Sequence, residues 1–259
     1  MADLRNYQAR TATVGSRADA AIDEGLRSYM LRVYNLMALG LAITGVAALG
    51  TVSLATTGDP SAAVAALGNG KLLTSFGAAI YGSPLRWVVM LAPLAAVFFL
   101  SFRVHKMSVA AAQATFWAYA ALVGISLSSI FLVYTTGSIV QTFFITAASF
   151  GALSLWGYTT KRDLSGMGSF LFMGLIGLII AMVVNIFLAS SALQFAISGI
   201  GVLIFAGLTA YDTQQIKEMY YEGDGTLVAS RKAIMGALRL YLDFINLFMF
   251  LLQFLGNRE

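Results

Sequence analysis

The sequence predicts an all-α membrane protein. Hydrophobic residues make up 59% of the 259 residues and charged residues only 11%, whereas a soluble domain is about 45–50% apolar and about 25% charged. The apolar residues stand in unbroken blocks, and the period-two alternation that a membrane β-barrel requires is absent from the sequence. These observations together favour a bundle of membrane-spanning helices.

Seven blocks are suited to cross the roughly 30 Å of hydrocarbon in a bilayer. We expect the seven spans at Val33–Ala55, Trp87–Phe102, Val109–Tyr134, Ile139–Tyr158, Gly168–Ala189, Leu193–Tyr211 and Ala233–Leu255. The second block is short and contains Pro93, which predicts a kink. The connector of residues 58–86 is rich in Gly, Ala and Ser and is expected to hold a small surface or re-entrant helix. Small residues four apart predict close helix packing at two places, Ala147 with Gly151 and Gly177 with Ala181.

The chain divides into two parts. Residues 1–32 carry five arginines and four acids with no apolar core, so they predict a retained, polar, cytoplasmic tail and no cleaved signal peptide. Within this tail, Arg17–Arg32 is compatible with an interfacial helix or with a disordered arm. Residues 33–256 are expected to form a single seven-helix transmembrane domain.

The distribution of Lys and Arg predicts the orientation. The tail and the connectors after the second, fourth and sixth spans carry 12 of these residues, and the other side carries two. The N-terminus is therefore expected in the cytoplasm. Seven crossings place the C-terminus outside, but a re-entrant hairpin in the last block would keep it inside.

Two aspartates are the main functional candidates. The chain has only 12 Asp and Glu residues, yet Asp212 ends the sixth block and Asp243 lies about ten residues into the last one. An ionisable group in hydrocarbon costs several kcal/mol unless it is paired, protonated or facing water. Both blocks reach the same side of the membrane here, so the carboxyl groups are expected at similar depth. Two such carboxyl groups do not both ionise readily and titrate as a pair that shares a proton.

Other readings of these polar residues stay open. Arg239 lies four residues before Asp243, so a local ion pair within one helix is an alternative, and Asp212 is also compatible with an interfacial residue or a helix-end cap. Asn185 and Asn246 are candidates for pore ligands or for interhelical hydrogen bonds. Carboxylate oxygens suit Ca²⁺, although two carboxylates fall short of its usual six to eight oxygen ligands.

The composition excludes several kinds of chemistry. With no cysteine there is no disulfide or thiolate site, and with one histidine there is no His-pair metal site. The net charge of +4 is modest and gives no reason to expect nucleic-acid binding. We expect no enzyme activity and no cofactor.

Three segments carry a family resemblance. FAGLTAYDTQQIKEMY (Phe205–Tyr220) followed by LRLYLDFINLFMFLLQFLG (Leu238–Gly256) resembles the C-terminal signature of the Bax inhibitor-1 family, also called the transmembrane Bax inhibitor motif or lifeguard family. GYTTKRDLSGMGSFLFMGLIG (Gly157–Gly177) resembles the junction of its fourth and fifth spans. The resemblance covers the chain from about Asp23 onward. It implies a seven-helix fold with the last helix in the centre.

The resemblance also implies a function and a site. Family members are associated with a pH-sensitive calcium leak and, in eukaryotes, with suppression of cell death. Asp212 of YDTQ and Asp243 of LYLDF match the paired-aspartate pH sensor of the family. Arg103 of LSFRVHK matches the arginine that pairs with the first aspartate in the closed state, although Lys106 is close by.

We therefore expect a pH-sensitive calcium or cation leak channel, or a regulator of calcium flux, of the bacterial type and in the inner membrane. The expected partners are the lipid bilayer, calcium or other cations, and membrane proteins. One alternative is an intramembrane aspartyl protease, but those enzymes carry GxGD at the second aspartate, where this chain has Leu240-Tyr241-Leu242-Asp243. The other alternative is a non-conducting membrane factor that acts through protein partners.

Overall fold

The computed structural model describes residues 2–258, and the side chains of residues 24–104 and 106–258. The side chains of the predicted tail therefore lie outside the described part up to residue 23. The first helix, α1, is continuous over Ala2–Ala55, so the tail and the first span belong to one helix. Among the residues whose side chains are described, the part of α1 that is long and apolar enough to cross a membrane lies within Glu24–Ala55.

The prediction of an all-α protein with seven spanning helices is confirmed. Within the described residues, seven helices are long and apolar enough to cross a membrane. After α1 they are α3 (Leu85–Arg103), α4 (Val109–Leu127, continued by the 3-10 helix η4, Ser128–Leu132), α5 (Thr136–Thr159), α6 (Ser165–Leu188), α7 (Ser191–Glu218) and α8 (Thr226–Leu255). A short 3-10 helix, η3 (Val104–Lys106), joins α3 to α4.

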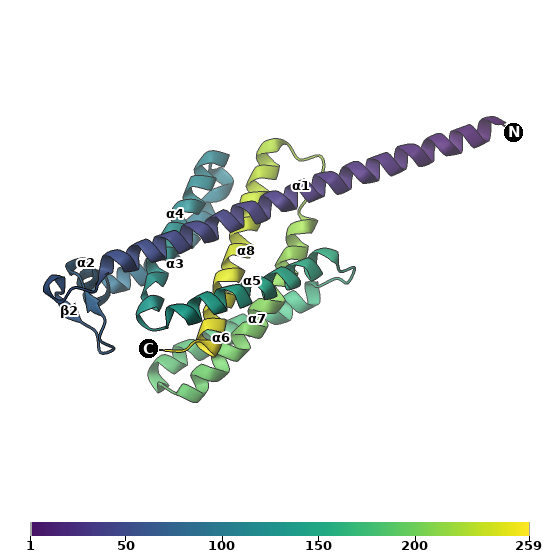
Figure 1. Cartoon of the computed structure of the whole chain (residues 1–259). Coiled ribbons are helices and arrows are strands. Elements are labelled where there is room, and N and C mark those ends of the chain that lie inside the picture. The colour runs from purple at the N-terminus through teal and green to yellow at the C-terminus, as the bar shows by residue number, and fades with distance from the viewer. Residues whose placement is uncertain (1, 259) are drawn as a thin grey trace.

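The last helix lies in the centre of the bundle, as expected. In its most apolar stretch 67% of the residues are buried, against 39% or less in the other six spans. It packs against α1 and α4 on one side and against α5 and α7 on the other (Figure 1). By contrast, α3 and α6 are peripheral, and large apolar side chains such as Phe170, Met173, Ile180 and Phe187 on α6 are exposed. An exposed apolar surface of this kind is favourable in contact with lipid and unfavourable in contact with water.

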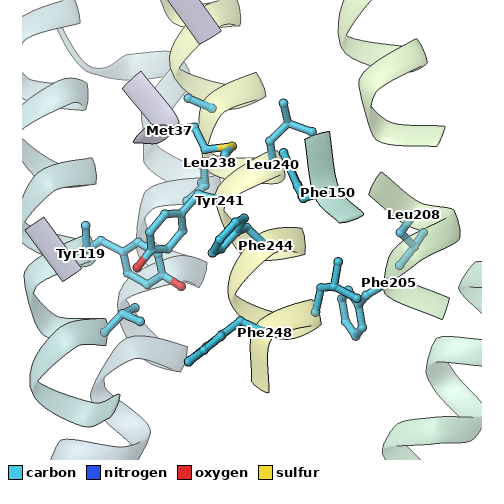
Figure 2. Close-up of a cluster of buried hydrophobic side chains, with 14 of the residues drawn as sticks. Met37, Tyr119, Phe150, Phe205, Leu208, Leu238, Leu240, Tyr241, Phe244 and Phe248 are labelled. Carbon is cyan, nitrogen blue, oxygen red and sulfur yellow. The ribbon is translucent and has the colours of Figure 1, made fainter. Parts of the chain in front are cut away.

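A buried aromatic cluster sets the rotation of α8 (Figure 2). The fully buried Tyr241 has its ring centroid 5.6 Å from that of Phe116 and 5.8 Å from that of Tyr119. Its hydroxyl shares a 2.7 Å hydrogen bond with Thr44 of α1, because a buried phenol needs a partner. Residues two apart on a helix point to nearly opposite faces. With Tyr241 facing α1 and α4, Asp243 therefore faces α7.

The connector between α1 and α3 contains a small sheet that the sequence did not predict. Strands β1 (Thr56–Thr57), β2 (Ala65–Ala66) and β3 (Leu72–Leu73) pair antiparallel in the order β1-β3-β2, with Thr56 opposite Leu73. The expected helical content is limited to η1 (Pro60–Ala62), α2 (Ser75–Gly77) and the π-helical turn η2 (Ala78–Gly82).

The C-terminus lies at the same end of the bundle as this connector. Asn257 accepts a hydrogen bond from the backbone N–H of Thr135 (3.1 Å), and its own N–H donates to Ser138 (2.9 Å). Asn69 and Lys71 of the connector donate to the backbone carbonyls of η4 nearby. Because α8 is unbroken from the opposite end, it crosses the whole bundle, and the re-entrant hairpin is wrong.

Close helix approach occurs at other glycines than those predicted. A Cβ at Gly151 or Gly177 would meet nothing within 4 Å, so the prediction of tight packing there was wrong. At Gly157 of α5 a Cβ would instead collide with the backbone carbonyl of Ala210 in α7. The four-residue spacing of small residues does not reveal which helix face meets a neighbour, and this face decides where a glycine is needed.

Candidate functional site

Asp212 of α7 and Asp243 of α8 come together between their helices. Their carboxyl groups lie within hydrogen-bonding reach of each other. Asp243 is only 5% exposed, and its Oδ2 atom has no hydrogen-bond partner among the described residues. A buried oxygen without a donor costs about 1–3 kcal/mol. One proton shared between the two carboxyl groups would supply such a donor, and this sharing stays a prediction.

The helices are longer than the apolar blocks, and this changes the setting of Asp212. The sixth span was expected to end at Tyr211, but α7 continues to Glu218 and its C-cap is Met219. Asp212 is therefore an interior residue of the helix, and the reading as a helix-end cap is wrong. The added turns of α7 contain Gln and Lys, which are good helix formers although they are polar.

Arg239 links the two aspartates to a positive charge. Its Nη1 atom lies 4.0 Å from Oδ1 of Asp212, across the interface between α8 and α7. The arginine side chain is 48% exposed and that of Asp212 is 19% exposed. A pair this open to its surroundings contributes at most about 1 kcal/mol. Among the described residues Arg239 pairs with Asp212 of the neighbouring helix and not with Asp243, so the predicted local ion pair within α8 is not formed in this structure.

The aspartates stand at one end of a groove of about 840 Å³ between α6, α7 and α8. Its floor includes Phe205 and Leu208 of α7. The polar residues that line it are Ser169, Tyr211, Asp212, Arg239, Asp243 and Asn246. The apolar residues that line it are mainly Phe172, Leu175, Leu178, Ile179, Met182, Leu242 and Phe250. The groove therefore has a charged cluster at one end and a long apolar lining beyond it.

The two asparagines have different places. Asn246 lines the groove, and its amide donates a 2.8 Å hydrogen bond to the backbone carbonyl of Leu242 in its own helix. Asn185 is at the far end of α6, where it donates to Gln194 (3.1 Å) and accepts from the N–H of Ser190 (3.1 Å). Asn185 thus holds the turn between α6 and α7 and is not brought to the aspartates.

Arg103 is not among the residues that line the groove. It is exposed at the end of α3, where its guanidinium lies over the ring of Phe99 at 5.8 Å. The cation beside Asp212 in this structure is Arg239. The role of Arg103 as a counter-charge in a closed state stays a prediction.

The donor set limits what calcium can do here. Among the side chains that the structure describes, no group of three or more His, Cys, Asp or Glu is placed to hold a metal ion. Asp212 and Asp243 supply carboxylate oxygens of the kind Ca²⁺ prefers, but Ca²⁺ is usually held by six to eight oxygens. Two carboxylates alone therefore fall short of the ligands that a stable Ca²⁺ site needs.

Sequence reasoning missed the roles of the other YDTQ residues, which extend the site into neighbouring helices. The ring of Tyr211 packs directly against Gly168 of α6 and fills the space that a side chain at position 168 would need. Thr213 shares a 2.8 Å hydrogen bond with Ser154 of α5, and Ser154 shares a 2.7 Å bond with Tyr34 of α1. Four consecutive polar residues in a helix point about 100° apart, and this run was the signal that each contacts a different neighbour.

Gln214 completes the motif by holding the connector between α5 and α6. Its side chain donates to the carbonyl of Arg162 (2.8 Å) and accepts from the N–H of Leu164 (2.9 Å). In the same connector, Asp163 accepts a 2.8 Å hydrogen bond from the N–H of Ser165, and this bond lowers the pKa of the exposed Asp163 carboxyl. An ionised aspartate at this place also favours the start of α6.

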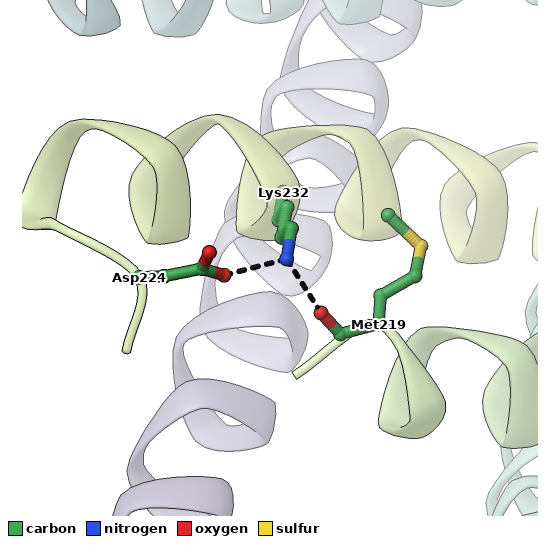
Figure 3. Close-up of polar contacts among 3 residues, drawn as sticks. All are labelled: Met219, Asp224 and Lys232. Atoms are coloured by element: carbon green, nitrogen blue, oxygen red, sulfur yellow. Dashed lines mark hydrogen bonds and ion pairs between the residues drawn. The ribbon is translucent and has the colours of Figure 1, made fainter. Parts of the chain in front are cut away.

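Basic residues fix the remaining connectors at this end. Lys232 lies 2.5 Å from Oδ2 of Asp224 and donates to the carbonyl of Met219 (2.9 Å), as Figure 3 shows. Lys217 donates to the carbonyl of Tyr158 (2.8 Å), which lies in α5. These cations therefore satisfy backbone carbonyls at helix ends, where the last carbonyls have no partner within their own helix.

Comparison with known proteins agrees with this architecture. A family model described as inhibitor of apoptosis-promoting Bax1 matches residues 26–259. An uncharacterized protein of Rickettsia prowazekii is 49% identical, over 96% of this chain and 98% of its own length. One from Caulobacter vibrioides is 47% identical over the full length of both chains. The inner membrane protein YbhL of Escherichia coli is 53% identical over 66% of this chain and 74% of its own.

The family match begins within the first span, covers the other six and includes both aspartates. The resemblance that the YDTQ and LYLDF segments carry is confirmed by it. The chain is a membrane protein that belongs to the Bax inhibitor-1 family.

Proposed function

We propose that the protein is a pH-sensitive leak channel for Ca²⁺ or other cations, or a regulator of such flux, and not an enzyme. We place it in the bacterial inner membrane with its N-terminus in the cytoplasm. The observation that carries the proposal is the contact between Asp212 and Asp243. Asp243 is buried, one of its oxygens lacks a donor, and the second carboxyl group is in reach.

Protons act on this pair through the packing of α7 against α8. With one proton the two carboxyl groups can hydrogen-bond and draw the helices together. Without it they carry two negative charges in a region of low dielectric and repel each other. A conformation that holds the proton more tightly is favoured at low pH, and this difference in proton affinity allows pH to shift the population.

The same oxygens are suited to a cation that passes through. Carboxylates attract Ca²⁺, yet two of them bind it too weakly to retain it. Conduction needs binding that is favourable enough to admit the ion and weak enough to release it. A gate formed by Asp212 and Asp243 has both properties.

Two aspartates within reach of each other also favour a second candidate, the intramembrane aspartyl protease. One experiment separates the candidates. The purified chain is placed in vesicles, and Ca²⁺ flux, K⁺ flux and cleavage of a fluorogenic transmembrane peptide are measured between pH 5 and 8. We expect cation flux that varies with pH and no cleavage.

Each alternative has its own outcome in that experiment. A protease would cleave the peptide without passing ions. A factor that acts only through partners would show neither flux nor cleavage, and this result would overturn the proposal of a leak channel. Empty vesicles and vesicles with heat-denatured protein give the background leak.

A further inference from the structure

The groove between α6, α7 and α8 has a charged end and an apolar end. Arg239 and Asp212, both partly exposed, lie at one end, close to where α7 meets its connector to α8. From there to Met182 and Phe250 the lining beyond Asn246 is apolar. An occupant that satisfies both ends is an amphiphile with a polar head and a hydrocarbon tail.

The length of the groove matches one leaflet of a bilayer. Along α8 it runs from Arg239 to Phe250, which is about 17 Å at 1.5 Å per residue. One leaflet contributes about 15 Å of the 30 Å hydrocarbon core. The charged end is six residues from the last residue of α7, or about 9 Å. The head of an amphiphile would thus lie near the membrane surface, with its tail along the apolar walls.

The charges at the head end favour a zwitterion. Arg239 carries one positive charge, and the two aspartates carry one negative charge between them when they share a proton, so the cluster has no net charge. It offers a cation to a phosphate and a carboxylate to an ammonium group, 4.0 Å apart. A purely anionic head would meet the carboxylates as well as the arginine.

Hydrogen-bonding capacity distinguishes between the possible zwitterionic head groups. The carboxyl group of Asp212 lines the groove and is 19% exposed, so it can be reached by a ligand. An ionised carboxylate accepts hydrogen bonds and donates none, so a head group placed against Asp212 has to supply the N–H donors. A primary ammonium has three N–H donors, as in lysine, whereas a trimethylammonium group has none. We propose that the groove binds one phosphatidylethanolamine of the surrounding bilayer, with its phosphate at Arg239 and its ammonium at Asp212.

The test uses lipid probes in vesicles that contain the full chain. Phosphatidylethanolamine, phosphatidylcholine and phosphatidylglycerol probes share one photoreactive acyl tail, and their adducts are mapped by mass spectrometry. We expect the ethanolamine probe to label Phe172–Met182 and Phe250 several-fold more than either other probe. Arg239→Gln and Asp212→Asn are each expected to remove this preference.

The protein supplies its own control. A second crevice, of about 320 Å³ and lined by Leu41, Val140, Phe144 and other apolar residues, has no charged residue in its lining. Labelling there should not depend on the head, and it reports whether each variant is folded in the membrane. Equal labelling of the groove by all three probes would overturn the proposal, and so would a preference for the glycerol probe or one that survives both substitutions. Ion flux plays no part in this test, so its result is separate from that of the proposed function.

Discussion

Ser154 of α5 and Thr213 of α7 share a buried hydrogen bond of 2.8 Å, and Thr213 directly follows the aspartate that contacts Asp243. Ser154 also bonds to Tyr34 of α1 at 2.7 Å. Three helices are thus connected by hydroxyl groups one residue away from the site. The aspartate pair is therefore attached to the rigid part of the bundle through Thr213.

Replacing Ser154 with Ala should destabilise the protein by about 1 kcal/mol, since it removes the bridging hydroxyl of a buried network. The thermal midpoint in detergent measures the loss. Ser149 is half-buried in the same helix, so Ser149→Ala is the matched control and should leave the midpoint unchanged. Equal effects of the two substitutions would show that the hydroxyl bridge does not stabilise the bundle.

Asp212→Asn and Asp243→Asn should each flatten the pH dependence of Ca²⁺ flux. Coupling to one proton changes an equilibrium by up to about tenfold per pH unit, and either substitution removes the shared proton while it preserves size. The double variant should be no flatter than the flatter of the two singles.

Asp59→Asn is the control for this experiment. Asp59 is exposed in the connector between α1 and α3, so the same chemical change there should not alter the pH profile. Wild-type flux with an unchanged profile in both aspartate variants would mean that the pair is structural and that the gating mechanism is incorrect.

Arg239→Gln should shift the pH midpoint of flux upward, because Arg239 favours the ionised form of the aspartates. The shift should be at most about one pH unit, since a half-exposed pair is worth at most about 1 kcal/mol. Arg103→Ala should instead raise the basal leak at neutral pH if Arg103 pairs with Asp212 in a closed state. Should Lys106→Ala raise the leak and Arg103→Ala leave it unchanged, the assignment of the closed-state cation would move to Lys106.

Gly157→Ala should destabilise the protein by about 1–3 kcal/mol, because the new methyl group would collide with the backbone of Ala210 and force α5 away from α7. Gly151→Ala, in the same helix but with open space around it, should be neutral or slightly stabilising. Denaturation in detergent compares the two. A neutral Gly157→Ala would show that the two helices are not in tight contact.

Single cysteines test the orientation cleanly, because the chain has none of its own. Cysteine at Ser165 should react with an impermeant thiol reagent only from the cytoplasmic side, and cysteine at Gly68 or Asn257 only from outside. Gly68 is preferable to Gly70, whose φ of 83° suits few other residues. Labelling of position 68 from the cytoplasm would reverse the predicted orientation.

The sequence allowed the seven spans and the aspartate pair to be predicted, for a physical reason. Long apolar blocks can satisfy their backbone in lipid only as helices, and two aspartates on sequential helices that meet at one end lie at similar depth. The helix ends were less accessible. Hydropathy detects the apolar part of α7, whereas its last turns, from Asp212 to Glu218, are polar except for Ile216 and extend beyond it.

Contacts between distant segments were the least predictable. Strands β1 and β3 are two residues long, and their pairing depends on where the connector folds back. Whether Arg239 reaches Asp212 depends on the rotation of α8, which Tyr241 sets through Thr44. Ser154 and Tyr34 carry no local signal at all, since each gains its role only from the neighbour that packing brings to it.

The side chain of Gln214 couples the connector between α5 and α6 to the buried helix α7. Gln214 lies two positions after Asp212 in α7, and its side chain is hydrogen-bonded to the backbone of Arg162 and Leu164. A movement of α7 that separates the aspartates must therefore break these bonds or carry the connector along. A binding protein that immobilised residues 160–165 would restrain the aspartates without touching them. The position of α7 would then depend both on that protein and on the protonation of the aspartates.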